Sequence, residues 1–122
     1  MPENDEEPDM LALCANYEGT VPENQQAFDH YIETVHLPLV AKYPRLRALR
    51  YLKGAARDGV APKYYLSFEL FFDSLEDFQL AAKSEQRNRA VEDAKKFAHQ
   101  FDGEIHHVMY EVNDIPVECS AD

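Results

Sequence analysis

Tryptophan is absent from this 122-residue chain, glycine occurs four times and cysteine twice, and no apolar run approaches the length needed to cross a membrane. The few glycines form neither a GxGxxG fingerprint nor a phosphate-binding loop. Cys14 and Cys119 form no CxxC pair and indicate no disulfide framework. These absences argue against nucleotide-motif enzymes and disulfide scaffolds and predict a single reduced domain. Because the N-terminus is acidic where a signal peptide would be basic, we expect a cytoplasmic location.

Basic residues are also scarce, since 12 Lys and Arg stand against 23 Asp and Glu and the net charge is −11. Residues 1–9 and 113–122 hold eight of the acidic residues and none of the basic ones, so the middle of the chain is closer to balance. We expect an acidic disordered tail over 1–9, a domain over 10–112 and a C-terminal tail over 113–122. No basic stripe would neutralise phosphates, which argues against nucleic acid or an anionic membrane surface as a partner.

An amphipathic helix is predicted just before His36, because apolar residues recur at i, i+3, i+4 and i+7. These residues are Phe28, Tyr31, Ile32 and Val35. Pro38 disfavours helical backbone at Leu37, so we expect this helix to end near His36 and a short turn to restart at Pro38. His36 would then lie at a helix C-terminus beside the core, where the backbone carbonyls favour its charged form.

The remaining segments predict the order strand, helix, strand, hairpin, strand, helix, strand. Strands are expected over 10–17, 46–53, 64–72 and 104–112, with helix starts between Thr20 and Asn24, at Ser74 and again at Ser84. The last two helical segments read either as separate helices or as one bent helix. This order is a split βαβ arrangement, an α+β fold with ferredoxin-like βαββαβ topology, a four-stranded antiparallel sheet and its helices on one face.

Two of the predicted strands, 10–17 and 64–72, are apolar on both faces. Helices cover only one face of such a sheet, and a bare face with large aromatic residues would be an unusually large apolar patch for a monomer. We therefore predict a two-fold homodimer that forms through the open sheet face.

Two side chains are candidates for proton transfer. His36 is either a general acid or base for a ligand between the sheet and its helix, or a histidine that caps the helix and donates to a backbone carbonyl. Glu69 is the single carboxylate in its aromatic strand. We expect it to pair with Arg50 on the neighbouring strand, and without a partner it would be a candidate proton donor.

The hydroxyl groups of Tyr31, Tyr65 and Ser67 are candidate substrate-binding groups, with ordinary core or interface packing as the alternative. His106 and His107 are adjacent on a strand, point to opposite faces and so do not bind one metal ion together. No clustered pattern of His, Cys and carboxylates in the sequence indicates a zinc or iron site, and we expect no metal or cofactor.

Several residues together resemble the signature of the EthD family, whose name comes from an ethyl tert-butyl ether degradation system. These are Phe28-Asp29, Tyr31, the run from Val35 to Leu39 that includes His36, then Pro44 and Leu46-Arg47. The resemblance covers most of residues 10–112 and implies a dimeric α+β barrel of ferredoxin-like protomers. His36 matches a histidine that recurs in this family, whereas Arg45 stands where the family usually has glycine.

The resemblance implies two functions. The first is a cofactor-independent isomerase or lyase in which His36 moves a proton on a small apolar or aromatic organic compound, such as a lactone or a polyketide-like ring. The second is a non-catalytic accessory protein that binds such a ligand for an oxidative degradation pathway. A haem-using member of the wider superfamily is a third interpretation, for which the chain offers no haem-specific motif.

Overall fold

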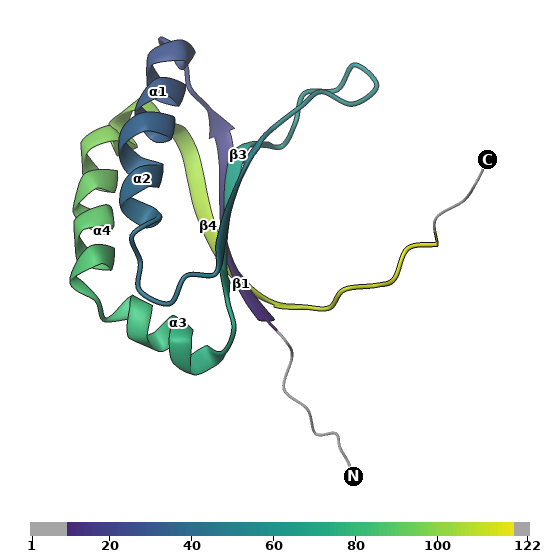
Figure 1. Ribbon diagram of the computed structural model, residues 1–122. Coiled ribbons are helices and arrows are strands. Elements are labelled where there is room, and N and C mark those ends of the chain that lie inside the picture. Colours follow the sequence, from purple (N-terminus) through teal and green to yellow (C-terminus); the bar gives the residue numbers. More distant parts are fainter. Residues whose placement is uncertain (1–9, 119–122) are drawn as a thin grey trace.

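The computed structural model describes residues 10–118, which form one sheet covered by helices on one side (Figure 1). The strands are β1 (Met10–Thr20), β2 (Ala48–Lys53), β3 (Tyr64–Phe72) and β4 (Asp102–Val112). The helices are α1 (Gln25–Tyr31), α2 (Leu37–Val40), α3 (Leu75–Ala82) and α4 (Glu85–Phe97), with a π-helical turn η1 (Ile32–His36) and a 3₁₀ turn η2 (Ala98–Gln100). The expected acidic tail over 1–9 and Cys119 lie outside the described residues.

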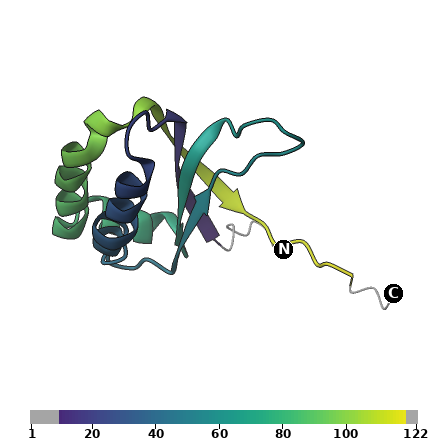
Figure 2. The same ribbon diagram turned by 90° about the horizontal axis from the view of Figure 1, so that it is seen from above.

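The sheet is antiparallel with the strand order β2-β3-β1-β4. The helices lie in a layer on one face, while the β2–β3 loop and residues 113–118 extend away on the other side (Figures 1 and 2). This arrangement confirms the predicted α+β ferredoxin-like fold. Among residues 10–118, no helix is both long and apolar enough to cross a membrane.

The core lies between the helix layer and the face of the sheet that carries Leu66, Phe68 and Phe72 of β3. Phe28 of α1 and Phe97 of α4 pack there with ring centroids 5.8 Å apart. Aromatic side chains bury much apolar surface per residue, which is the main source of stability for a domain of this size. The core therefore fixes α1 and α4 against the sheet, and the candidate site lies between them.

The first helix does not end at His36 as predicted. Leu37 has helical angles (φ −62°, ψ −38°), and its N–H donates to the carbonyl of Ile32, five residues back, in a π-helical turn. Proline lacks an N–H and its ring clashes with the carbonyl four residues before it, and the wider turn accommodates both defects of Pro38. The chain therefore passes from α1 through η1 into α2 without a break.

The π-helical turn also changes which side chain enters the core. It contains more residues per turn than an α-helix, so the residues after it are rotated relative to the predicted stripe. Val35, predicted to be apolar and buried, is 37% exposed, while His36 is only 6% exposed. The position of Val35 in the predicted stripe was therefore wrong, and an imidazole occupies the core in its place.

Side-chain caps begin the helices at positions where the sequence offered them. Asn24 accepts from the N–H of Ala27, and Ser74 and Ser84 accept from N–H groups three residues on, which makes α3 and α4 separate helices. Arg45, in the loop after α2, has a left-handed backbone with φ +67°. This is the conformation that glycine adopts without strain, so the loop keeps a glycine-type geometry with an arginine in it.

The open face of the sheet carries a small apolar cluster of Ala12, Cys14 and Phe71, with Met10 and Val112 packed against it. Cys14 is buried, and burial raises the pKa of its thiol. The ring of Tyr65 packs against Phe28 in the helix layer, with ring centroids 6.0 Å apart, at the point where the β1–β3 register shifts.

Candidate functional site

His36 is held in the core by a buried carboxylate from a distant part of the chain. Its Nδ1 lies 3.1 Å from Oδ2 of Asp93 on α4. Asp93 is 3% exposed, so both partners are buried. The imidazole packs against the rings of Phe97 and Phe68, with centroids 4.9 Å and 5.8 Å away. The predicted alternative, a histidine that donates to a backbone carbonyl at a helix end, is replaced by this side-chain pair.

Asp93 also accepts a hydrogen bond from the hydroxyl of Tyr31, one helical turn before His36 in the chain. The two oxygens of one carboxylate therefore receive Tyr31 and His36, which brings α1, η1 and α4 together. A buried carboxylate is costly unless its oxygens are hydrogen-bonded, and here both are. The three residues form one unit, which we call the Asp93 cluster (Tyr31, His36 and Asp93).

Burial lowers the pKa of His36 below its ordinary value of 6.5, because its desolvation outweighs the opposing effects of the hydrogen bond and charge of Asp93. The expectation that backbone carbonyls would favour the charged imidazole was therefore wrong, since the helix continues past His36. A neutral imidazole beside a carboxylate places its proton on Nδ1, the atom facing Asp93. Nε2 is then unprotonated and free to accept a proton.

His36 borders a cavity of about 150 Å³ between the sheet and the helices α2 and α4. Its wall is mainly apolar and is contributed by β1, β3, β4 and both helices. Apart from His36, it includes Tyr17, Phe68, Leu70, Ala90 and Ile105. His107 lies on the same wall, while the neighbouring His106 points to the other face and bonds Glu18, as strand alternation predicts.

Glu69 does not join His36. It pairs with Arg50 on the neighbouring strand at 3.6 Å, as predicted, on the open face of the sheet. Ser67 lies on that same face, two residues before Glu69 on β3. The two candidate groups are therefore separated from the cavity by the sheet itself.

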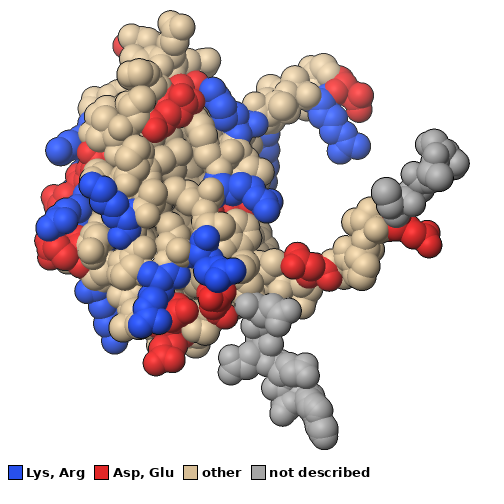
Figure 3. Space-filling view, in the orientation of Figure 1, with Lys and Arg blue, Asp and Glu red and all other residues tan. Residues whose placement is uncertain are grey.

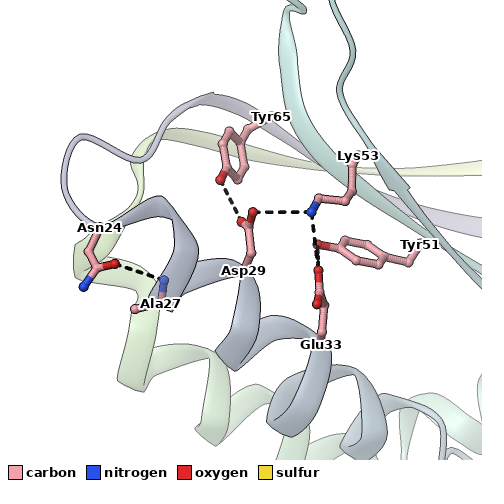
Figure 4. A network of polar contacts seen from close by, with 7 residues as sticks. All are labelled: Asn24, Ala27, Asp29, Glu33, Tyr51, Lys53 and Tyr65. Atoms are coloured by element: carbon pink, nitrogen blue, oxygen red, sulfur yellow. Dashed lines mark hydrogen bonds and ion pairs between the residues drawn. The ribbon is translucent and has the colours of Figure 1, made fainter.

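Tyr65 belongs to a separate polar network at the start of α1 (Figure 4). Its hydroxyl donates to Asp29 at 2.7 Å, and Lys53 lies 3.5 Å from both Asp29 and Glu33. Tyr51 donates to the same Glu33. All these polar groups have partners, so the network ties α1 to β2 and β3, and Tyr65 does not line the cavity beside His36.

Asp93 was not among the candidate residues predicted from the sequence. The signal was present, because Ala90, Asp93, Ala94 and Phe97 follow the i, i+3, i+4, i+7 spacing of one helix face. A carboxylate within an apolar stripe indicates a buried partner elsewhere in the chain. Its partner was not identifiable, since the π-helical turn that buries His36 leaves no mark on the apolar pattern.

A second group of chelating side chains lies away from the cavity. Glu18, near the end of β1, and Glu104 and His106, near the start of β4, bring one ligand atom each to within 4.8 Å of one another. His106 Nε2 already lies 2.8 Å from Glu18, so this histidine is satisfied within the protein.

Over the face seen in Figure 3, Lys and Arg are interspersed with Asp and Glu.

Comparison with known proteins gives a consistent family assignment. The model of the EthD domain matches residues 22–100. An uncharacterised 11.0 kDa protein from the thcB-thcC intergenic region of Rhodococcus erythropolis is 30% identical over 77 residues, which cover 63% of this chain and 75% of that protein. The crystal structure of an EthD family protein from Bacillus halodurans superposes with a TM-score of 0.73 and 31% identity, over 85% of this chain and 99% of that one.

More distant solved structures share the fold alone. A dimeric protein of unknown function with a ferredoxin-like fold from Bacteroides fragilis has a TM-score of 0.59 and 16% identity, over 85% of this chain and 97% of that one. The hydroxynitrile lyase of Passiflora edulis has a TM-score of 0.64 and 16% identity, over 91% of this chain and 100% of that one. The fold thus occurs both in a dimeric protein and in a lyase.

Proposed function

This chain belongs to the EthD family, and on that premise we propose that it binds a small apolar or aromatic organic compound in the cavity beside His36 and transfers a proton on it. His36 is the general base, and no metal or nucleotide takes part. The reaction class is that of an isomerase or lyase that removes a proton from carbon.

The observation that carries this proposal is the pair formed by His36 and Asp93. The carboxylate accepts the Nδ1–H, so the lone pair of Nε2 remains available. Burial keeps the imidazole neutral at pH 7, which is the form that accepts protons.

The lining of the cavity supports the choice of substrate. Its side chains are mainly aliphatic and aromatic, and the described residues on it include no lysine, arginine or carboxylate. An ionised ligand would lose its hydration without gaining a counter-charge, which is costly. The compound that suits this wall is therefore uncharged, with most of its surface apolar.

The proposal includes a two-fold homodimer through the open face of the sheet. Tyr110 on that face is 51% exposed and pairs with Ala12 of an apolar cluster in which Ala12, Cys14 and Phe71 are already buried within the protomer. Packing this face against its own copy would cover Tyr110 and is the simplest isologous interface. Related folds described as dimeric, such as the Bacteroides fragilis protein, favour this assembly. Light scattering of the pure protein should give a mass of two chains, and a mass of one chain would contradict it.

The experiment measures proton transfer from carbon on a neutral two-ring ketone, 2-tetralone, as the exchange of its α-hydrogens in D₂O. Wild-type protein should accelerate the exchange beyond the same concentration of free imidazole. His36→Gln should abolish the excess rate, while His99→Gln, which changes an exposed histidine on η2, should leave it intact. An equal excess rate in wild type and His36→Gln would refute the assignment of the base.

The second function, a non-catalytic ligand-binding accessory protein, uses the same cavity. The favouring observation is that His36 is the single buried ionisable group on the described cavity wall, apart from tyrosine hydroxyls. Saturable binding of 2-tetralone without excess exchange would support this alternative over the enzyme.

A further inference from the structure

We propose that the hydroxyl of Tyr17 binds an oxygen atom of the substrate, so that the ligands of this cavity are apolar ring compounds with a hydrogen-bond-accepting carbonyl group. This inference rests on the proposed function and adds to it the polar group of the substrate that the site recognises. Tyr17 was not among the candidate residues identified from the sequence.

The tyrosines of this protein differ in whether their hydroxyl groups are hydrogen-bonded. Tyr31, Tyr51 and Tyr65 are partly buried, and each donates its hydroxyl to a carboxylate. Tyr17 is more deeply buried than any of them, at 3% exposed, yet its hydroxyl has no hydrogen-bond partner among residues 10–118. Tyr43, half-buried on the same cavity wall, also lacks one within those residues.

A buried hydroxyl without a partner is unfavourable, and the great majority of buried polar groups in proteins are satisfied. Both tyrosines that lack a partner line the cavity that His36 lines, whereas Tyr31, Tyr51 and Tyr65, which do not line it, donate to carboxylates. Their location indicates a group that enters the cavity and accepts their hydrogen bonds.

The ring of Tyr17 cannot readily turn away to reach solvent. It packs against Phe68 with centroids 5.4 Å apart and against Phe101 with centroids 5.2 Å apart. On β1 it lies between Leu66 of β3 and Ile105 of β4. A side chain held in this way is preorganised, so its hydroxyl needs no rearrangement to bind a ligand.

Burial raises the pKa of the Tyr17 phenol well above its ordinary value, so the group is a hydrogen-bond donor at neutral pH. A carbonyl oxygen suits such a donor. When Nε2 of His36 removes a proton from the carbon next to that carbonyl, the C–H electron pair forms a carbon–carbon double bond. The carbonyl π electrons then move to oxygen, where the Tyr17 hydroxyl stabilises the developing negative charge. Return of a proton to carbon restores the ketone, and exchange results when a deuteron from D₂O has first replaced the proton on Nε2 of His36.

The first test uses the free protein and the substitution Tyr17→Phe, which keeps the ring and removes the hydroxyl. Because this hydroxyl makes no bond within the described protein, the urea midpoint of unfolding should stay unchanged or rise. The matched control is Tyr65→Phe, which removes a hydroxyl that does bond Asp29, and its midpoint should fall. A fall in Tyr17→Phe as large as in Tyr65→Phe would show that Tyr17 is satisfied within the protein and overturn the inference.

The second test compares two probes of similar shape, 2-tetralone and tetralin, which differ in the carbonyl oxygen. Wild type should bind 2-tetralone roughly five- to tenfold more tightly than tetralin, the ratio expected for one neutral hydrogen bond. Tyr17→Phe should bind both with equal affinity and should exchange the α-hydrogens of 2-tetralone more slowly. An unchanged preference for the ketone in Tyr17→Phe would overturn the inference.

The two proposals fail in different ways. If His36→Gln keeps the excess exchange rate, the base is wrongly assigned, but the ketone preference still tests Tyr17. If His36→Gln loses the exchange while Tyr17→Phe keeps both the rate and the ketone preference, the proposed function stands and Tyr17 has no part in it. Failure of both probes to bind the wild-type protein would overturn both proposals.

Discussion

Replacing Asp93 with asparagine removes the charge that joins α1, η1 and α4. An asparagine side chain has nearly the same volume, so packing against α1 and η1 is retained in Asp93→Asn. The carboxylate accepts two hydrogen bonds, from Tyr31 and from His36, at a position that is 3% exposed. An amide has one oxygen and an NH₂ group, so it accepts one of these bonds and turns a donor toward the other.

The expected loss of stability follows from those contacts. A hydrogen bond to a charged group contributes about 1.5–3 kcal/mol, and a buried donor left without a partner costs about 1–3 kcal/mol. Removing the buried charge offsets part of this loss of stability, because the desolvation cost of the charge disappears. We therefore expect Asp93→Asn to lower the free energy of unfolding by about 2–4 kcal/mol.

The assay is equilibrium unfolding in urea, followed by circular dichroism. Glu92→Gln provides the matched control, since Glu92 is the neighbouring acidic residue on α4, is 69% exposed and pairs with Lys95 on the surface. Its unfolding midpoint should not change measurably, because exposed ion pairs contribute little. If Asp93→Asn were as stable as Glu92→Gln, the Asp93 cluster would not hold the site together and the reasoning would be refuted.

Three other properties of the protein can be tested by substitution. The folded-state pKa of His36 lies below its ordinary value of 6.5, so the unfolded chain takes up a proton there first as the pH falls. The free energy of unfolding should therefore drop as the pH is lowered below about 6.5, and His36→Gln should lose this part of the drop. An identical pH profile in wild type and His36→Gln would contradict the lowered pKa. Arg45 has a left-handed backbone and a surface ion pair with Asp77 at 3.3 Å. Arg45→Gly and Arg45→Ala both lose the ion pair, but only glycine relieves the strain, so urea unfolding should find the glycine variant about 1 kcal/mol more stable; equal stability would argue against strain there. Tyr110→Glu places a charge on the open face of the sheet, and light scattering should then give the mass of one chain; a persistent dimer would place the interface elsewhere.

The sequence predicts the fold well because the strands have strong local signals. The predicted bounds of the strand Tyr64–Phe72 match those of β3, and Ser74 and Ser84 begin the helices that their capping geometry predicts. Each of these features depends on residues within a few positions of one another. The βαββαβ order then leaves few topologies, since crossover handedness is restricted.

The site is less predictable because it depends on one irregular turn and on a contact between distant residues. The rule that a proline ends the preceding helix predicted a break at Leu37, whereas the chain forms a π-helical turn that buries His36 and exposes Val35. His36 and Asp93 are 57 residues apart in sequence, so no local pattern connects them. Tyr17 is a similar case, since only its burial without a partner distinguishes it from other core tyrosines.

The most direct test of the central claim is the ¹⁵N NMR spectrum of the His36 ring, assigned by comparison with His36→Gln and recorded as a pH titration. We predict a neutral imidazole with its proton on Nδ1, an unprotonated Nε2 and a pKa below 6.5. A proton on Nε2 at neutral pH, or a pKa above 6.5, would contradict the assignment of His36 as the base of this site.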